Sequence, residues 1–397
     1  MDDSCRADKP ETFDSLAIAA ERMLSDVFGS QIRLTSVERL SEPGRRNLIL
    51  RCLSSPISDF PSRYIIKKVE SDSYHPEDPD SWDSQRFFSD WVGSQFLSVL
   101  GGGANHGPRF YGGNRELGFI ILEDLGHHRS LVEPLLHEDA ISAEKSLFRY
   151  SARLGKLHAD TVNQFSVFEQ FFHSVNSTGR SFAPKANELE QSIQQFQTSL
   201  EGLGVVAEAS LLQDLTAIAT PVVNPGPFLA YIHGDPCPDN VFDTPDLMRL
   251  IDFEFGHFGH ALIDATYARM IFPTCWCANR LPRAIVAQME SRYRTELIQG
   301  CPEAQEDRVF ELALVTICGF WLLNTLVRHL ERALEEDQSW GLASLRQRIL
   351  ARVEAFVTAS EDFKQLPALR GTAGRLLTLL GKRWPESAQL PLYPAFR

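Results

Sequence analysis

The sequence predicts an α+β protein with two parts, a small sheet-rich N-terminal part and a larger, mainly helical C-terminal part. Two observations support this prediction. Short β-rich segments separated by turn residues fill most of the chain before Gly126, and the pattern then changes abruptly to helix. A length of 397 residues is also enough for two lobes with sizeable cores.

In the N-terminal part, apolar residues at helical spacing predict a helix over Phe13–Phe28. A second helix is expected over Gln85–Leu100, ended by Gly101–Gly103. The turn Ser41–Asn47 contains a single glycine, Gly44. We expect strands over Ile32–Leu40, Leu48–Leu53, Arg63–Val69, Pro108–Gly112 and Gly118–Gly126.

The C-terminal part reads as helix over His137–Thr161, through much of residues 163–225, and from Leu281 onward. Its longest apolar run, Leu312–Val327, contains polar residues and is short for a membrane span. We therefore expect that run to be a buried helix of the larger lobe.

The composition limits the class of protein. A hydrophobic content of 43% and a charged content of 23% are ordinary for a globular chain. A formal charge of -13 argues against nonspecific nucleic-acid binding, and no membrane partner is expected. Seven scattered cysteines and an acidic N-terminus without a signal pattern favour a reduced, cytoplasmic protein. The sequence leaves a homodimer open.

Two motifs carry the chemistry, the stretch Tyr231-Ile-His-Gly-Asp-Pro-Cys-Pro-Asp-Asn-Val-Phe242 and the stretch Leu250-Ile-Asp-Phe-Glu254. Asp235, Asn240 and Asp252 fall where apolar segments end, so their side chains are expected to project into a cleft. Carboxylate and amide oxygens suit Mg²⁺ bound with a nucleotide. Asp235 is then left over to act as a base.

Together these motifs resemble the catalytic loop and metal loop of the aminoglycoside phosphotransferase and choline kinase-like family. The resemblance extends over about residues 37–275. It implies a two-lobed, protein kinase-like fold, with a nucleotide-binding lobe over 1–122 that holds an antiparallel sheet and one key helix. A hinge over 123–127 and a helical lobe over 128–397, with the substrate pocket, would follow.

The resemblance also implies roles for single residues. Asp235 would orient the acceptor hydroxyl and take its proton, and Asn240 and Asp252 would hold Mg²⁺. Lys67 would grip the phosphates of ATP or GTP, with Lys68 as its exposed neighbour. Strand alternation alone does not separate these two lysines.

Further roles follow from the same resemblance. Asp90 would pair with the lysine, Gly44 would lie over the phosphates, and Glu123 would end the strand against which the adenine lies. His233 is expected to brace the catalytic loop by bonding to the backbone of the metal loop. Asp264 is expected to cap or brace the same loop.

The function implied is an ATP-dependent phosphotransferase that moves a γ-phosphoryl group to a hydroxyl of an aminoglycoside-like, choline-like or natural-product-like molecule. The alternative is a catalytically silent nucleotide-binding module, which the single glycine of the Gly44 loop favours and an intact Asp235 disfavours. A protein kinase is disfavoured because Gly234 stands where such enzymes carry arginine, and no Ala-Pro-Glu segment follows.

A rival site is a zinc centre. Two histidines and three cysteines are its candidate ligands, but their spacing fits no standard zinc finger. The other reading is that they line or support the substrate side of the cleft. The five residues are His257, His260, Cys237, Cys275 and Cys277.

Overall fold

The structure is a computed structural model. It describes residues 10–56, 60–78, 80–100, 105–137, 139–176, 179, 181–244, 246–387 and 389–397. By their internal contacts the residues form two compact units. Unit 1 consists of Met1–His127 with Phe168–Ser181, and unit 2 consists of His128–Val167 with Phe182–Arg397. The predicted glycine stop at Gly101–Gly103 lies outside the described residues, as does Cys5.

Unit 1 is built on a five-stranded sheet in the order β1-β2-β3-β5-β4. Every neighbouring pair of these strands is antiparallel, as predicted. The β1–β2 turn contains Gly44, and the central strand β3 carries Lys67 and Lys68. The strands are β1 (Leu34–Arg39), β2 (Asn47–Ser54), β3 (Arg63–Val69), β4 (Phe110–Asn114) and β5 (Phe119–Glu123).

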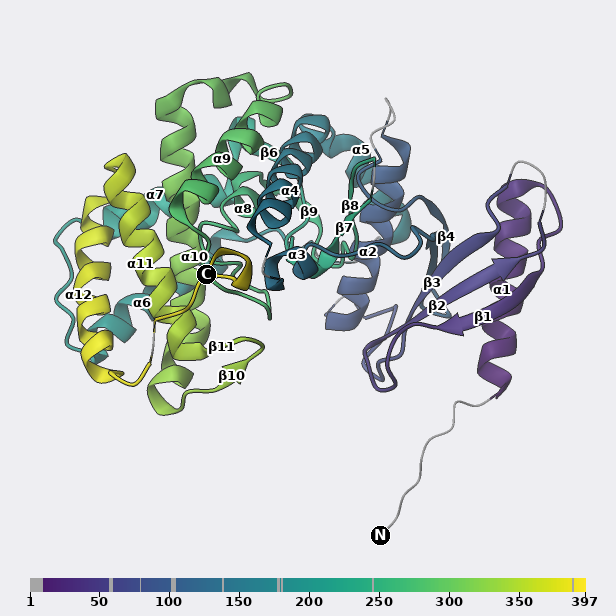
Figure 1. Ribbon diagram of the computed structural model, residues 1–397, viewed down its shortest axis with the longest axis horizontal. Coiled ribbons are helices and arrows are strands. Elements are labelled where there is room, and N and C mark those ends of the chain that lie inside the picture. The colour runs from purple at the N-terminus through teal and green to yellow at the C-terminus, as the bar shows by residue number, and fades with distance from the viewer. Residues whose placement is uncertain are drawn as a thin grey trace, which may run out of the picture. The chain divides into compact units, whose positions relative to one another are not determined.

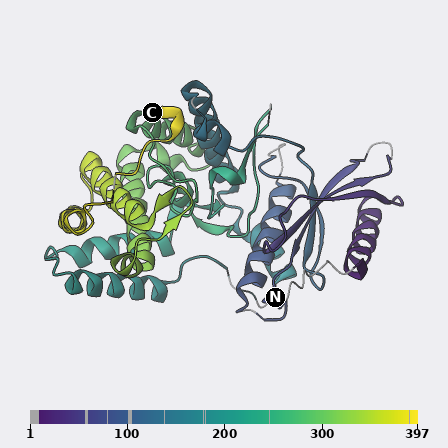
Figure 2. The ribbon, with the colours of Figure 1, turned by 60° about the horizontal axis from the view of Figure 1, so that its bottom comes forward.

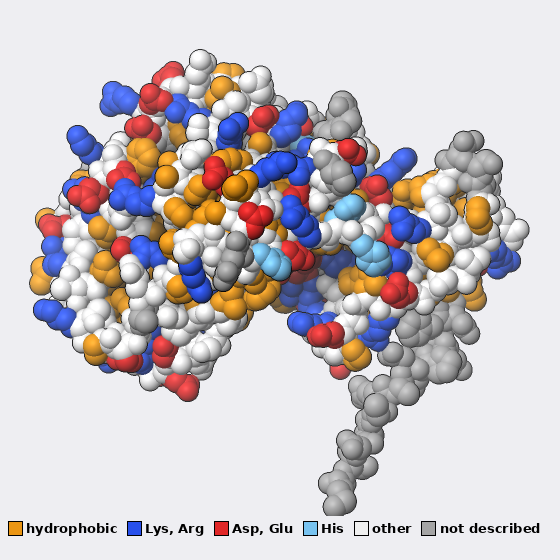
Figure 3. Space-filling view, viewed as in Figure 1, with side chains coloured by type: hydrophobic (Ala, Val, Ile, Leu, Met, Phe, Trp, Pro, Cys, Tyr) orange, Lys and Arg blue, Asp and Glu red, His pale blue; other side chains and the backbone are white. Residues whose placement is uncertain are grey.

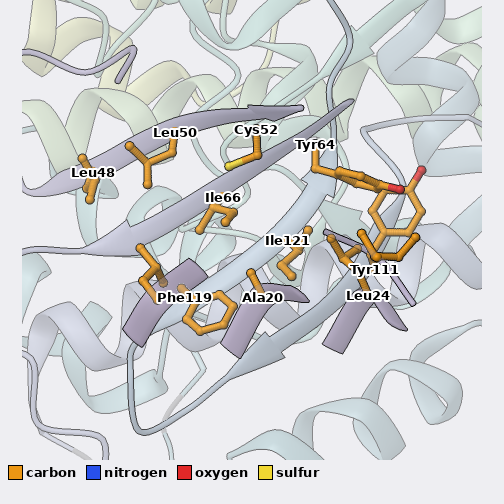
Figure 4. Packing of buried hydrophobic residues seen from close by; sticks show 12 residues of the cluster. Ala20, Leu24, Leu48, Leu50, Cys52, Tyr64, Ile66, Tyr111, Phe119 and Ile121 are labelled. Carbon is orange, nitrogen blue, oxygen red and sulfur yellow. The ribbon is translucent and has the colours of Figure 1, made fainter. Parts of the chain in front are cut away.

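A helix covers each face of this sheet, α1 (Pro10–Phe28) on one side and α2 (Trp82–Val99) on the other (Figures 1 and 2). The sheet can be covered on both faces because successive residues of a strand point to opposite sides. In β5, Ile121 packs in the α1 cluster while Ile120 packs in the α2 cluster. Figure 4 shows the α1 side, where Ala20 and Leu24 face apolar side chains of the strands.

Unit 2 is mainly helical (Figure 1). In it, α4 packs against α9, and α10 and α12 both pack against α11. Its helices are α3 (Val132–Leu136), α4 (Ala140–Thr161), α6 (Ala186–Gly202), α7 (Leu211–Val223), α8 (Leu262–Ala265), α9 (Arg283–Leu297), α10 (Asp307–Glu335), α11 (Leu345–Phe363) and α12 (Pro367–Arg383). The helix α5 (Phe165–Val175) begins in unit 2 and ends in unit 1.

The long helix α10 is apolar enough, by length and composition, to cross a membrane. Within the structure, however, 78% of its apolar window is buried. Its indole Trp321 donates a hydrogen bond from Nε1 to the carbonyl of Ile263 at 3.0 Å, which ties α10 to α8. These facts favour the predicted core helix over a membrane span.

Short antiparallel hairpins carry the motifs of unit 2. The strand β6 (Leu229–Ile232) pairs with β9 (His257–His260), and β7 (Val241–Asp243) pairs with β8 (Met248–Leu250). A third hairpin joins β10 (Ser339–Trp340) to β11 (Ala343–Ser344). Because Asp235 follows β6 and Asp252 follows β8, both acids leave the ends of short strands, as predicted.

The predicted fold class is confirmed, with a small antiparallel-sheet unit and a larger helical unit. The division into units assigns Phe168–Ser181 to unit 1, although the sequence placed this segment in the helical lobe. Within it, the ring of Phe168 packs edge-on against Phe96 of α2. The lobe boundaries at 122 and 128 therefore stay a prediction. On the visible face of unit 2, acidic and basic side chains are interspersed (Figure 3).

Candidate active site

The loop that carries Asp235 has a backbone that only glycine accommodates at one position. Gly234 has φ +77°, and a Cβ atom there would lie 2.5 Å from the carbonyl oxygen of Phe255. Left-handed backbone is costly for residues with a side chain. The glycine therefore lets the loop after β6 turn sharply against the metal loop.

Buried Asp264 of α8 braces this turn, as the sequence predicted. Its carboxylate accepts the backbone N–H of His233 at 2.7 Å and that of Gly234 at 3.1 Å. The buried His158 lies 3.3 Å from the same carboxylate and 2.7 Å from the hydroxyl of Tyr293, so it is a satisfied core histidine. Burial alone would raise the pKa of Asp264, but the hydrogen bonds from the His158 side chain and from the backbone N–H of His233 outweigh it and lower that pKa.

His233 joins the catalytic loop to the metal loop. Its Nε2 lies 2.9 Å from the carbonyl oxygen of Ile251, and its Nδ1 accepts the backbone N–H of Asp235 at 3.4 Å. A carbonyl can only accept and an N–H can only donate, so these partners select the neutral tautomer with its proton on Nε2. The imidazole is used as a brace, in agreement with the sequence-based expectation.

The carboxylate of Asp235 is held from one side. Its Oδ1 accepts the hydroxyl of Tyr267 at 2.8 Å, the thiol of Cys237 at 3.0 Å and the hydroxyl of Thr274. Burial, followed by the charge of Asp235, raises the pKa of Tyr267 well above its ordinary value, so its phenol stays a donor. Because all three donors bond to Oδ1, they fix the orientation of the Asp235 carboxylate. Its Oδ2 points away from these donors.

Asn240 is tied directly to the Asp235 loop. Its Nδ2 donates to the backbone carbonyl of Asp235 at 3.0 Å, so the amide oxygen is the atom that can serve a cation. The backbone N–H of Ile251 donates to the Asn240 carbonyl at 3.0 Å and extends the β7–β8 pairing by one step. Asp252 is thus the residue that follows the backbone partner of Asn240. Asp252 has φ +68°, a conformation that aspartate tolerates better than most residues.

The donor chemistry here fits Mg²⁺. An amide oxygen and a carboxylate are hard ligands of the kind this ion takes, few in number because it keeps several waters. The pKa of the half-buried Asp239 is raised, in part by the negative charge of its neighbours. Burial raises its pKa most, the indole N–H of Trp276 lowers it, and the charges of Asp235 and Asp252 raise it. A divalent cation would relieve this repulsion between carboxylates.

In unit 1, the structure distinguishes the two lysines of β3. The ammonium Nζ of Lys67 lies 2.6 Å from Oδ2 of Asp90 in α2, with side-chain exposures of 14% and 4%. Lys68 instead donates to the carbonyl of Val69 at 3.2 Å. Asp90 therefore pairs with Lys67, although aspartate is shorter than glutamate.

Gly44 and Glu123 are not brought together. Gly44 lies in the turn beside the end of the sheet where Asn47 pairs with Val69, whereas Glu123 pairs with Tyr64 at the other end of β3. Gly44 has φ +80°, and a Cβ there would have no described neighbour within 4 Å. The Glu123 carboxylate accepts the backbone N–H of Arg109 at 3.0 Å.

The zinc reading that includes the histidines is not supported among the described residues. His257 Nδ1 lies 2.8 Å from the carbonyl of Phe255, and His260 Nδ1 accepts the N–H of Leu262 at 3.2 Å. Burial lowers the pKa of both, that of His260 to about 3, so both stay neutral. Among the described residues, neither belongs to a group with metal-ligand spacing.

Sequence reasoning missed the donors around Asp235. Tyr267 and Thr274 are far from Asp235 in sequence and meet it only through the fold, so no local pattern reveals them. Trp276, which donates to Oδ2 of Asp239 at 2.8 Å, was missed for the same reason. Cys237, two residues from Asp235, was visible in the motif but carried no assigned role toward it.

No protein-family model matches the chain, and neither does any curated protein. Among solved structures, it is similar to a choline/ethanolamine kinase family protein from Mesorhizobium loti, with 16% identity, 91% of this chain and 99% of that chain covered, and a TM-score of 0.48. A choline kinase from Cryptosporidium parvum matches with 12% identity, 87% and 93% coverage, and a TM-score of 0.47. The streptomycin–ATP–APH(2")-IIa ternary complex matches with 13% identity, 81% and 93% coverage, and a TM-score of 0.44.

These structures come from the class of small-molecule kinases that the motifs of the sequence resemble. At such low identities and TM-scores, they carry neither an activity nor a substrate over to this chain.

Proposed function

We propose that this chain is a phosphotransferase that moves the γ-phosphoryl group of ATP or GTP to a hydroxyl of a small molecule. The observation that carries the proposal is the bonded network of Asp235, Asn240 and Asp252 in unit 2. The carbonyl of Asp235 accepts the Asn240 amide, and the carbonyl of Asn240 accepts the N–H next to Asp252. These two hydrogen bonds hold the proposed base, Asp235, and the proposed cation ligands, Asn240 and Asp252, in neighbouring loops.

Phosphoryl transfer depends on position and charge, because its transition state spreads negative charge over the transferred group. The carboxylate of Asp235 orients the acceptor hydroxyl and accepts its proton as the bond to phosphorus forms. The hydroxyls of Tyr267 and Thr274 hold that carboxylate in place. Preorientation of this kind removes reorganisation from the reacting step.

Asn240 and Asp252 are the residues that would hold Mg²⁺, which neutralises phosphate charge when it is bound. Lys67 of unit 1 is the proposed phosphate contact, kept extended by its ion pair with Asp90. Gly44 and Glu123 are proposed, respectively, to lie over the phosphates and at the adenine end of the strand. Nucleotide binding is thereby assigned to residues that the sequence singled out.

The test is nucleotide turnover by the purified chain across a panel of alcohols. The panel takes aminoglycosides, choline and natural-product alcohols, the classes that the sequence resemblance names. Mg²⁺-dependent release of nucleoside diphosphate, with an added phosphate on one acceptor detected by mass spectrometry, is the expected result. The six described cysteines are free thiols, so the assay is run under reducing conditions, in keeping with the proposed cytoplasmic setting.

The alternative function is a nucleotide-binding module without turnover. Tight binding of Mg²⁺-nucleotide, combined with no phosphorylated acceptor in the panel, would favour that alternative. The absence of both binding and turnover would overturn the proposed phosphotransferase. Hydrolysis of nucleotide without any phosphorylated alcohol would leave water as the acceptor and would also contradict it.

A further inference from the structure

Three thiols and a carboxylate gather beside the catalytic loop of unit 2. The ligand atoms of Cys237, Asp239 and Cys275 lie within 4.8 Å of one another. The sulfur of Cys277 lies 3.1 Å from that of Cys275. The cysteines are close to fully buried, with exposures of 4%, 0% and 0% for Cys237, Cys275 and Cys277.

The two carboxylate oxygens of Asp239 differ in their hydrogen bonding. Oδ2 of Asp239 accepts the indole N–H of Trp276 at 2.8 Å, which fixes the side chain. Its other oxygen, Oδ1, is buried and has no hydrogen-bond partner among the described residues. A buried acceptor without a partner is costly, and a bound cation is one way to satisfy it.

We propose that Cys237, Asp239 and Cys275 form the core of a binding site for one thiophilic divalent cation of the zinc class, and that the side chain of Cys277, whose sulfur lies outside their 4.8 Å group, turns in as the fourth ligand. Three sulfurs and one carboxylate oxygen are a ligand set that zinc takes in tetrahedral sites. Two sulfurs, each ~2.3 Å from one tetrahedral ion, lie roughly 3.8 Å apart. The Cys275 and Cys277 sulfurs, at 3.1 Å, need to move apart only slightly to reach this spacing.

The loop that supplies two of the sulfurs is anchored independently of any cation. Arg348 of α11 donates to the carbonyls of Cys275 at 2.8 Å and Trp276 at 3.1 Å. Arg352 of the same helix donates to the carbonyl of Pro273 at 2.7 Å. Ligands held by such outer contacts are pre-positioned. Both guanidinium groups also offset the negative charge of three thiolates and a carboxylate around a divalent ion.

This site is distinct in chemistry from the pair Asn240 and Asp252. Mg²⁺ prefers oxygen ligands, whereas a site dominated by sulfur selects softer ions. Binding releases one proton from each thiol that becomes a ligand, and these protons pass to solvent. Cys237 then no longer donates to Asp235, whose Oδ1 keeps the hydroxyls of Tyr267 and Thr274 as donors. The cation would join the catalytic loop, through Cys237 and Asp239, to the loop that carries Thr274. The proposal does not depend on the proposed phosphotransferase activity.

The test measures zinc on the full chain, purified under reducing conditions, stripped with a chelator, supplied with Zn²⁺ and desalted. About one zinc per chain is expected in the wild type, and it should survive excess Mg²⁺. Cys275→Ser and Asp239→Asn should each weaken zinc binding by about tenfold or more. Cys301→Ser, which removes another buried free cysteine of unit 2, is the matched control and should bind as the wild type does.

A second measurement needs no variant and is therefore independent of their folding. Titration of the stripped wild type with Cd²⁺ should produce the thiolate-to-cadmium absorption band, saturating at about one ion per chain. Absence of both the zinc and the cadmium signal in the wild type would overturn the site. Equal zinc binding by Cys275→Ser and the wild type would also overturn it.

Discussion

Lys67 of unit 1 and Asp235 of unit 2 are held in place by different means. Lys67 projects from a regular strand and meets Asp90 of a regular helix, so secondary structure positions both partners. Asp235 lies in a loop that includes Gly234 at φ +77°, and polar side chains from distant segments hold it. The first arrangement relies on an ion pair, and the second relies on several hydrogen bonds from separate segments.

The two arrangements should respond differently to a single substitution, one mainly through activity and the other through stability. A side chain on a strand can be replaced while the sheet keeps its backbone bonds. A loop whose N–H groups are satisfied by a buried carboxylate loses its own conformation with that carboxylate. We therefore expect changes at Lys67 to affect mainly activity, with a loss of stability from the buried Asp90 carboxylate that loses this ion pair, and changes at Asp264 to affect mainly stability.

The largest effect is expected for Asp264→Ala. The substitution leaves the N–H groups of His233 and Gly234 without their acceptor and should lower the free energy of unfolding by about 3–5 kcal/mol. Urea unfolding followed by circular dichroism measures it. The exposed Asp246→Ala is the control, with an expected change within about 0.5 kcal/mol. An equal, small change in the free energy of unfolding of both variants would contradict the claim that Asp264 stabilises the turn at His233 and Gly234.

The next effect concerns the two lysines of β3. Lys67→Ala should lower kcat/KM for phosphoryl transfer by roughly 10²–10³-fold, because it removes a positive charge proposed to face the phosphates. Lys68→Ala is the matched control, since the ammonium group of Lys68 donates to the neighbouring carbonyl of Val69 and not to Asp90. A larger loss of kcat/KM in Lys68→Ala than in Lys67→Ala would contradict the assignment of Lys67 as the phosphate contact. Circular dichroism of both variants checks that the sheet remains folded.

A smaller effect is expected from His260 as the pH falls. Burial lowers the folded-state pKa of this histidine to about 3, whereas an unfolded histidine titrates near ~6.5. Below that pH the unfolded state binds the proton and the folded state does not, so stability falls as the pH falls. Between pH 7 and pH 5 this histidine should cost about 2 kcal/mol.

The measurement is the free energy of unfolding at both pH values for the wild type and for His260→Asn. Asparagine keeps a short acceptor for the N–H of Leu262 but does not titrate in this range. The variant should lose about 2 kcal/mol less than the wild type over the interval. Identical pH dependence in the two proteins would show that His260 is not held neutral.

The smallest effect separates two glycines of unit 1. Gly44 and Gly29 both have positive φ, and a Cβ at either would meet no described atom within 4 Å. Alanine at either position should therefore cost roughly 1 kcal/mol of stability. Only Gly44→Ala should also weaken nucleotide binding, as measured by calorimetry. Equal nucleotide affinity in both variants would remove Gly44 from the proposed site.

Much of unit 1 could be predicted from the sequence because its signals are periodic. The segment Arg63–Val69 is a strand with the predicted bounds, and both covering helices lie where apolar spacing placed them. Strand alternation alone did not separate Lys67 from Lys68 as the partner of Asp90, whereas the family resemblance pointed to Lys67, the lysine that pairs in the structure. Neighbouring residues of a strand point to opposite faces, and the sequence does not say which face α2 covers.

For the active-site loop of unit 2, the sequence predicted the contacts made within the motifs but not those made by distant segments. The motif predicted the braces by His233 and Asp264, because those residues lie in or close to the motifs themselves. It could not predict Thr274 or Tyr267, whose hydroxyls reach Asp235 only after the chain has folded back. Such contacts depend on tertiary packing, which leaves no spacing in the sequence.

The central claim is that Asp235 is the base of a phosphoryl transfer. The most direct test compares kcat of the wild type and Asp235→Asn on the best acceptor of the alcohol panel. Asparagine keeps an oxygen for Tyr267 and Thr274, so stability and nucleotide affinity should be unchanged. The account predicts a fall in kcat of roughly 10²–10⁴-fold. Full activity of Asp235→Asn would contradict it.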